Sequence, residues 1–235
     1  MTTTLEELWR ERADAPRWAA ACLAAVAATL ALVALGSEAY ESVLGMARPV
    51  APVVAVVGLG FGGWLVLARR SWIPASTEGP AGYRAAVLIG LALPLPVIGV
   101  DCLGGFGPGI NAPAPDALLF YPSIAVVAES VFHIAPLAAA ATLAFFVRRA
   151  GRSLELCGLV AAVAIEPILQ VVWGAEASPG WANAYVGVHL LAFNLIAVVL
   201  LRRFGILRAL VFRLSYYFVW HILWGFLRLE LLFSG

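Results

Sequence analysis

Residues 118–147, LLFYPSIAVVAESVFHIAPLAAAATLAFFV, decide the fold class of this chain. Only two side chains among these thirty residues, Glu129 and His133, can carry a charge near neutral pH. A hydrocarbon layer about 30 Å thick needs about 20 apolar residues in helical form, so the stretch is long enough to cross a bilayer. Pro122 and Pro136 predict that this helix is tilted or kinked.

Six further stretches of the chain are comparably long and apolar. Together they predict an all-α, polytopic membrane protein with seven transmembrane helices. The third span contains Pro94 and Pro96 and is expected to be the least regular helix. The seven predicted spans are 17–36, 49–68, 85–103, 118–147, 154–174, 184–201 and 207–228.

The overall composition supports a membrane protein. Hydrophobic residues make up 63% of the 235 residues and charged residues 12%, against roughly 45–50% and about 25% in soluble domains. This composition excludes a disordered protein, a disulfide scaffold and a nucleic-acid-binding protein. All 15 basic residues are arginines, and without a lysine the chain cannot form the Schiff base of a retinal protein.

The arginines predict the orientation of the chain in the membrane. Twelve lie on one side of the predicted spans, two on the other, and Arg213 lies inside the last span. The positive-inside rule then places the N-terminus in the cytoplasm and the C-terminus outside a bacterial-type cytoplasmic (inner) membrane. The twelve are Arg10, Arg12, Arg17, Arg69, Arg70, Arg84, Arg148, Arg149, Arg152, Arg202, Arg203 and Arg208, and the two are Arg48 and Arg228.

The chain divides into three predicted parts. Residues 1–16 form a polar cytoplasmic arm, residues 17–117 three transmembrane helices with an outer Gly/Pro-rich loop, and residues 118–235 a four-helix core. The glycine-rich stretch 58–63 (GLGFGG) lies inside an apolar span without a preceding strand, which argues against a nucleotide-binding loop. Its small residues are expected to let helices approach closely.

Polar residues within the last four spans predict a shared interior pocket. A charged group inside the bilayer is costly and requires a partner or a function. These spans bring polar groups to compatible depths, with Glu166, His189 and Asn194 among them. Both a functional site and an ion-paired packing device explain the pair formed by Glu129 and His133. The residues expected around the pocket are Glu129, His133, Gln170, Arg213 and Tyr217.

A metal site is an alternative use of the same spans. Glu166, His189 and His221 supply one carboxylate and two imidazoles, which zinc accepts in catalytic sites. No two of these residues are close in sequence, and a buried histidine is more often a hydrogen-bonded structural residue. We therefore predict neither a metal nor a cofactor.

The order of motifs from residue 128 onward resembles the CPBP family, the CAAX-processing and bacteriocin-processing intramembrane proteases. That family has a Glu-Glu-x-x-x-Arg motif, a helix ending in Phe-x-x-x-His, and a final helix with His-x-x-x-Asn or His-x-x-x-Asp. In this chain 128–133 (AESVFH), 165–170 (IEPILQ) followed by Trp173, and 213–217 (RLSYY) occupy the corresponding positions. The stretch 201–207 (LRRFGIL) resembles the step that precedes the last motif.

The chain departs from these motifs at most of the family's catalytic positions. The resemblance thus implies a CPBP-like core in a pseudoprotease, or in an accessory or scaffolding subunit of a membrane complex. The alternative that it implies is an active intramembrane peptidase with a glutamate as the base and polar donors around the water or oxyanion. Only Glu129 matches the family, while Ala128 replaces a Glu, His133 an Arg, Gln170 and Arg213 the two His, and Tyr217 the Asn or Asp.

A small-molecule transporter is a third hypothesis. Proline-interrupted spans and polar groups near the midplane favour it, whereas the lack of a recognisable inverted repeat argues against it. The expected partners are membrane lipids and other membrane protein subunits that contact lipid-facing helix surfaces, with no role for nucleic acid.

Overall fold

The computed structural model describes residues 12, 14–74, 80–147, 151–174 and 178–234, and every regular element among them is a helix. Seven helical runs in these residues are long and apolar enough to cross a membrane. The chain is therefore an all-α polytopic membrane protein, as the sequence predicts. The predicted arm 1–16 lies largely outside the described residues. The runs are Asp14–Ala34, Val50–Arg69, Gly82–Cys102, Ala117–Phe146, Gly151–Gly174, Gly180–Phe204 and Ile206–Phe233.

Four of these runs are single helices and three are built from consecutive helical segments. The single helices are α2 (Asp14–Ala34), α4 (Val50–Arg69), α9 (Gly151–Gly174) and α10 (Gly180–Phe204). The third run consists of α5 (Pro80–Ala92) and α6 (Pro94–Cys102), and the break at Leu93 precedes Pro94, which has no backbone N–H. Two short elements in the connections are α3 (Ala39–Leu44) and the 3₁₀ turn η1 (Pro108–Ile110).

The fourth run is one continuous helix whose hydrogen-bonding pattern changes in the middle. It comprises α7 (Ala117–Ala128), the π-helical segment η2 (Glu129–Ile134) and α8 (Ala135–Phe146). The amide of Ala135 donates to the carbonyl of Ser130, five residues back. Pro136 follows directly and cannot donate to the carbonyl four residues before it, so the wider turn lies where the α-helical ladder is interrupted.

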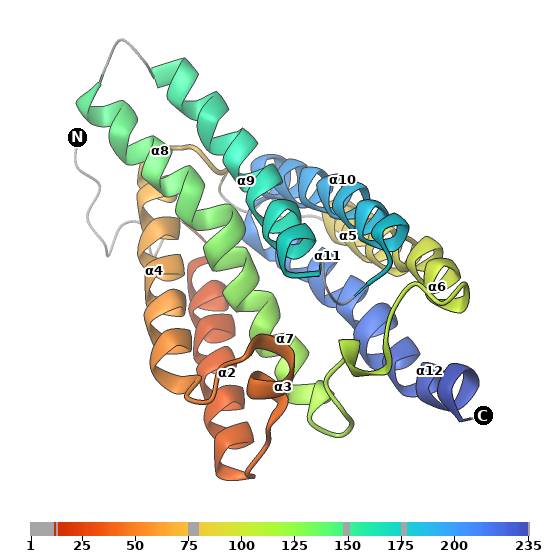
Figure 1. The fold of residues 1–235 in the computed structure, drawn as a ribbon. Coiled ribbons are helices and arrows are strands. Elements are labelled where there is room, and N and C mark those ends of the chain that lie inside the picture. The colour runs from red at the N-terminus through yellow and green to blue at the C-terminus, as the bar shows by residue number, and fades with distance from the viewer. Residues whose placement is uncertain (1–11, 13, 75–79, 148–150, 175–177, 235) are drawn as a thin grey trace.

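The seventh run has the same construction. It comprises α11 (Ile206–Tyr217), the π-helical segment η4 (Phe218–Leu223) and α12 (Trp224–Phe233). The fourth and seventh runs lie at the centre of the helix contacts. The segments of the fourth run contact α2 and α4 on one side and α9 and α11 on the other. In the seventh run, α11 also packs against α5 and α10. Figure 1 shows the long green run lying between α2 and α4 and the blue helices.

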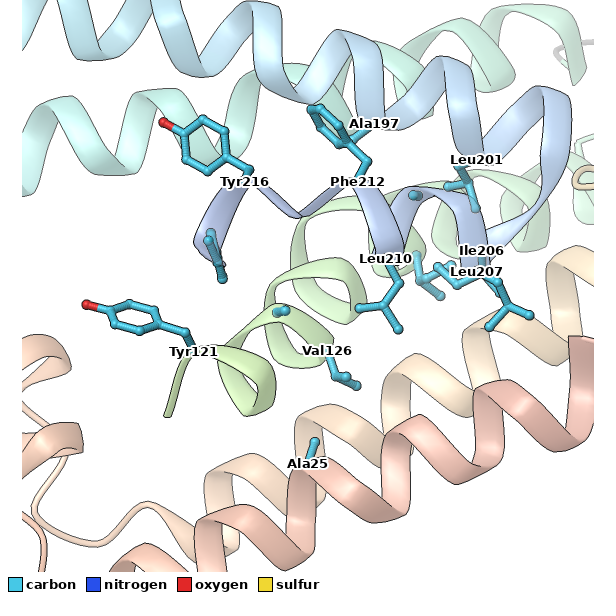
Figure 2. Close-up of a cluster of buried hydrophobic side chains, with 14 of the residues drawn as sticks. Ala25, Tyr121, Val126, Ala197, Leu201, Ile206, Leu207, Leu210, Phe212 and Tyr216 are labelled. Atoms are coloured by element: carbon cyan, nitrogen blue, oxygen red, sulfur yellow. The ribbon is translucent and has the colours of Figure 1, made fainter. Parts of the chain in front are cut away.

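An apolar core surrounds α11 at this junction. Leu210 and Phe212 are buried on α11, and Figure 2 shows Leu210 pointing toward Val126 of α7 while Phe212 lies beside Ala197 of α10. The ring centroid of Phe212 lies 4.7 Å from that of Phe193 on α10. This apolar packing holds α11 in the orientation in which its polar residues point toward the interior of the molecule.

The glycines of the 58–63 stretch divide into two kinds. A Cβ added at Gly60 would lie 2.0 Å from Oγ of Ser130, and one added at Gly63 would lie 2.8 Å from Cγ2 of Ile134. By contrast, a Cβ at Gly58 or Gly62 would meet no other atom within 4 Å. Two of these glycines therefore allow α4 to lie directly against the π-helical segment η2, as expected for close helix packing.

This difference provides a matched test of the close approach. We expect Gly60→Ala to destabilise the protein by about 1–3 kcal/mol, because the new methyl group overlaps Ser130 and displaces η2. Gly62→Ala should leave stability unchanged or raise it slightly, since alanine favours helix over glycine by about 1 kcal/mol. Thermal unfolding of the purified variants in one detergent measures both; equal melting temperatures would contradict the packing described here.

Candidate functional site

The π-helical segment η2 positions the first pair of polar side chains. Nδ1 of His133 lies 2.7 Å from Oε2 of Glu129 and donates to it. Both side chains have no exposed surface. The i, i+4 spacing read from the sequence therefore does place the imidazole and the carboxylate on one side of the helix.

Arg213 of α11 joins this pair to a second carboxylate. Its Nε donates to Oε1 of Glu129 at 2.7 Å. Its Nη1 and Nη2 donate to Oε1 and Oε2 of Glu166 on α9, at 3.1 Å and 3.0 Å. The guanidinium uses its rigid fork for the two-pronged contact with Glu166, a geometry that lysine could not provide.

Asn194 of α10 and Tyr217 of α11 complete the set. Oδ1 of Asn194 lies 3.1 Å from Nε2 of His133 and accepts from Nη2 of Arg213 at 3.5 Å. The hydroxyl of Tyr217 accepts from Nη1 of Arg213 at 3.1 Å. We call this group of Glu129, His133, Glu166, Asn194, Arg213 and Tyr217 the buried polar network.

Aromatic rings cover the guanidinium. The Cζ atom of Arg213 lies 4.8 Å from the ring centroid of Phe193 and 5.8 Å from that of Tyr217. Cation–π contacts of this kind strengthen when water is excluded, and Arg213 has no exposed surface. The network is consequently a buried set of polar and charged groups that links the fourth, fifth, sixth and seventh runs.

The closed arrangement limits the chemistry that the network can perform. Each of the four carboxylate oxygens of Glu129 and Glu166 accepts a hydrogen bond from a side chain. Two carboxylates face one guanidinium, and the imidazole of His133 donates to one of these carboxylates as well. Such an arrangement can hold helices together, whereas a general base needs an oxygen within reach of water or substrate.

The structure brings four of the five expected pocket residues together. Glu129, His133, Arg213 and Tyr217 belong to the network, but Gln170 is exposed on α9 and takes no part in the hydrogen bonds that join it. Gln170 lies one turn further along α9 than Glu166, in the last turns of the helix, which also expose Ile168. Glu166, one turn earlier, provides the contact from this helix instead.

The residues of the alternative metal site lie in three separate hydrogen-bonded groups. Glu166 binds Arg213, as above. His189 lies between the hydroxyls of Tyr185 and Tyr216, at 3.2 Å and 3.0 Å. Nδ1 of His221 lies 2.6 Å from Oδ1 of Asn111. Within the described residues no three His, Cys, Asp or Glu side chains form a cluster suited to a metal ion.

The sequence analysis missed another buried ion pair, near the end of the seventh run. Arg228 of α12 binds both carboxylate oxygens of Asp101 at 2.7 Å and 2.8 Å, and Nε1 of Trp224 donates to the same carboxylate at 2.7 Å. Arg228 also donates to the carbonyls of Phe106, Gly107 and Pro108. Asp101, the lone acidic residue of the third predicted span, was the signal that could have pointed to this clamp.

Comparisons with known proteins do not place the chain in a family. No protein-family model, no curated protein and no solved structure matches it. The resemblance to the CPBP family therefore rests on the order and spacing of the motifs in the sequence.

The network predicts a specific pattern of stabilities. Arg213→Met leaves two buried carboxylates without their cation and should cost about 3–5 kcal/mol, which lowers the melting temperature by roughly 10 °C. Adding Glu129→Gln and Glu166→Gln to this variant removes the stranded charges and should restore most of the loss.

The control is Arg69→Met, which removes an exposed arginine at the end of α4 and should shift the melting temperature by less than about 2 °C. All four proteins are measured by thermal unfolding in the same detergent. A triple variant less stable than Arg213→Met would show that the ion pairs do not act as one unit.

Proposed function

We propose that this chain is a non-catalytic protein of a bacterial-type cytoplasmic membrane, a pseudoprotease-like accessory or scaffolding subunit with a CPBP-like core. One observation carries the proposal. The glutamate at the family's catalytic position, Glu129, is fully buried, and both of its carboxylate oxygens are engaged, by Arg213 and His133.

This geometry is unsuited to hydrolysis. A glutamate that activates water needs a free oxygen facing that water, and the oxyanion needs donors that are not already committed. Here the donors of Arg213 point at Glu129, Glu166, Asn194 and Tyr217. Of the polar side chains at the family's catalytic positions, Glu129, His133, Arg213 and Tyr217 thus bind one another, and Gln170 is exposed on α9 outside the network.

The surface of the protein supports a role in binding other membrane components. Large apolar side chains are exposed along the transmembrane runs, for example Leu23 on α2, Leu59 on α4 and Val188 on α10, each about 70% exposed. Such surfaces fit lipid chains or the helices of partner subunits. The arginine-rich connections favour a cytoplasmic N-terminus and an outer C-terminus.

A peptidase assay tests the absence of catalysis. The full chain is reconstituted in lipid nanodiscs with membrane-proximal peptides, and cleavage is followed by mass spectrometry. We expect wild type, Glu129→Gln and the matched control Glu230→Gln, which alters an exposed acid on α12, to give the same background. Cleavage by wild type and Glu230→Gln that is lost in Glu129→Gln would establish an active peptidase.

The accessory role has a separate test. Native mass spectrometry of the full chain released from its own membrane in mild detergent should show a complex with at least one other membrane protein in fixed stoichiometry. A chain that is released only as a monomer would contradict the role of a subunit.

A further inference from the structure

We propose that a small pocket beside η1 and α12 binds the neutral hydroxyl group of an amphiphile. The pocket has a volume of about 70 Å³ and lies between the loop that follows η1 and the start of α12. A water molecule needs roughly 10–15 Å³ on such a measure, so the pocket accommodates a group of a few heavy atoms. It is lined by Pro108, Asn111, Ala112, Pro113, Ala114, Ala117, His221, Gly225, Phe226 and Leu229.

Two polar groups in the wall leave hydrogen-bonding capacity unused. Nδ1 of His221 donates to Oδ1 of Asn111 at 2.6 Å, which leaves Nε2 as the acceptor of the ring. Nε2 has no hydrogen-bond partner in the described part of the chain. Nδ2 of Asn111 is buried beside Gly225 and is likewise unpaired there. Two residues that line the pocket therefore offer one acceptor and one donor, the set of partners that a hydroxyl group uses.

The surrounding contacts hold these two groups in place. The ring of His221 stacks on Tyr121 with centroids 4.3 Å apart and an interplanar angle of 16°. The hydroxyl of Tyr121 accepts from the amide of Ala112 at 2.8 Å and donates to Oδ1 of Asn111 at 3.2 Å. Oδ1 is thus occupied twice, and the amide nitrogen of Asn111 is left as the group without a partner.

The charges around the pocket select a neutral ligand. None of the ten lining residues carries an acidic or guanidinium group. The nearby Arg228 donates to the carbonyl of Pro108, but its charge is already matched by Asp101. A phosphate would find no free cation and an ammonium no free carboxylate, whereas an uncharged hydroxyl meets both unpaired groups.

The apolar rim selects an amphiphile. Phe226 and Leu229 line the pocket and are 52% and 44% exposed on α12, which belongs to the seventh membrane-spanning run. A hydrocarbon chain attached to the hydroxyl can lie along these side chains while its polar end enters the pocket. Monoacylglycerols and diacylglycerols have this chemistry, and free glycerol has the hydroxyl without the chain.

The test uses the full chain in phosphatidylcholine nanodiscs with ¹⁵N-labelled histidine. The probes are 1-monooleoylglycerol, its dimethyl ether, which lacks hydroxyl hydrogens, and glycerol. We expect monooleoylglycerol to shift the Nε2 resonance of His221 and to leave His133 and His189 unchanged, because those rings are bonded at both nitrogens. The ether should produce no shift.

Variants extend the test to affinity, measured as the rise in melting temperature with probe concentration. His221→Phe keeps a ring against Tyr121 but removes Nε2, and Ala114→Leu fills the pocket from its wall; each should weaken binding at least tenfold. Leu231→Ala, on the exposed side of α12, is the control and should bind as wild type does.

Each outcome decides a part of the proposal. A response to glycerol equal to that of monooleoylglycerol supports the hydroxyl site and assigns it to a free polyol, whereas a response to monooleoylglycerol alone assigns it to a lipid. A shift of His221 by the ether, no response to any probe, or equal binding by wild type and both pocket variants would overturn the proposal.

Discussion

The cost of an unpaired charge between apolar helices is the constraint on which this structure depends. Glu129, Glu166 and Arg213 come from three different membrane-spanning runs and have little or no exposed surface. Any one of them alone would face a desolvation penalty of several kcal/mol. Each is tolerated because the others are present at 2.7–3.1 Å, so the relative positions of α9, η2 and α11 are fixed by charge as well as by packing. Hydrophobic packing between helices in lipid has little directional preference, and the polar contacts supply it.

Each of the two π-helical segments carries polar residues that the rest of the structure uses. Segment η2 carries Glu129 and His133 into the network, and η4 carries His221 to the wall of the pocket beside α12. Tyr217, the last residue of α11, lies between them: its hydroxyl accepts from Arg213, and its ring centroid lies 4.9 Å from that of His221. The Asp101–Arg228 clamp then holds the loop that forms the pocket. Wider turns of this kind within α-helices are frequent at functional sites.

The sequence predicts the membrane fold well because its signal is simple. An apolar stretch of about 20 residues has few alternatives to a spanning helix, and all seven predicted spans overlap the observed runs. The sequence also predicts that Glu129 and Arg213 line one interior pocket, since charged groups inside a membrane need a partner or a function. Which turn of a helix faces inward is harder to predict: Glu166 rather than Gln170 provides the contact from α9. The Asp101–Arg228 pair was missed because hydropathy places both residues at span ends, where charges are ordinary.

The buried polar network also limits which substitutions its positions accept. An arginine at position 213 is costly unless carboxylates surround it, and a carboxylate at position 166 is costly unless that arginine is present. His133 in turn binds Glu129 and Asn194, and Asn194 accepts from Arg213. Removing one charged member leaves its partners buried and unpaired, so we expect these residues to be kept or replaced together. In the buried polar network the charged groups bind one another, whereas Nε2 of His221 and Nδ2 of Asn111 are left without a partner in residues that line the pocket beside α12.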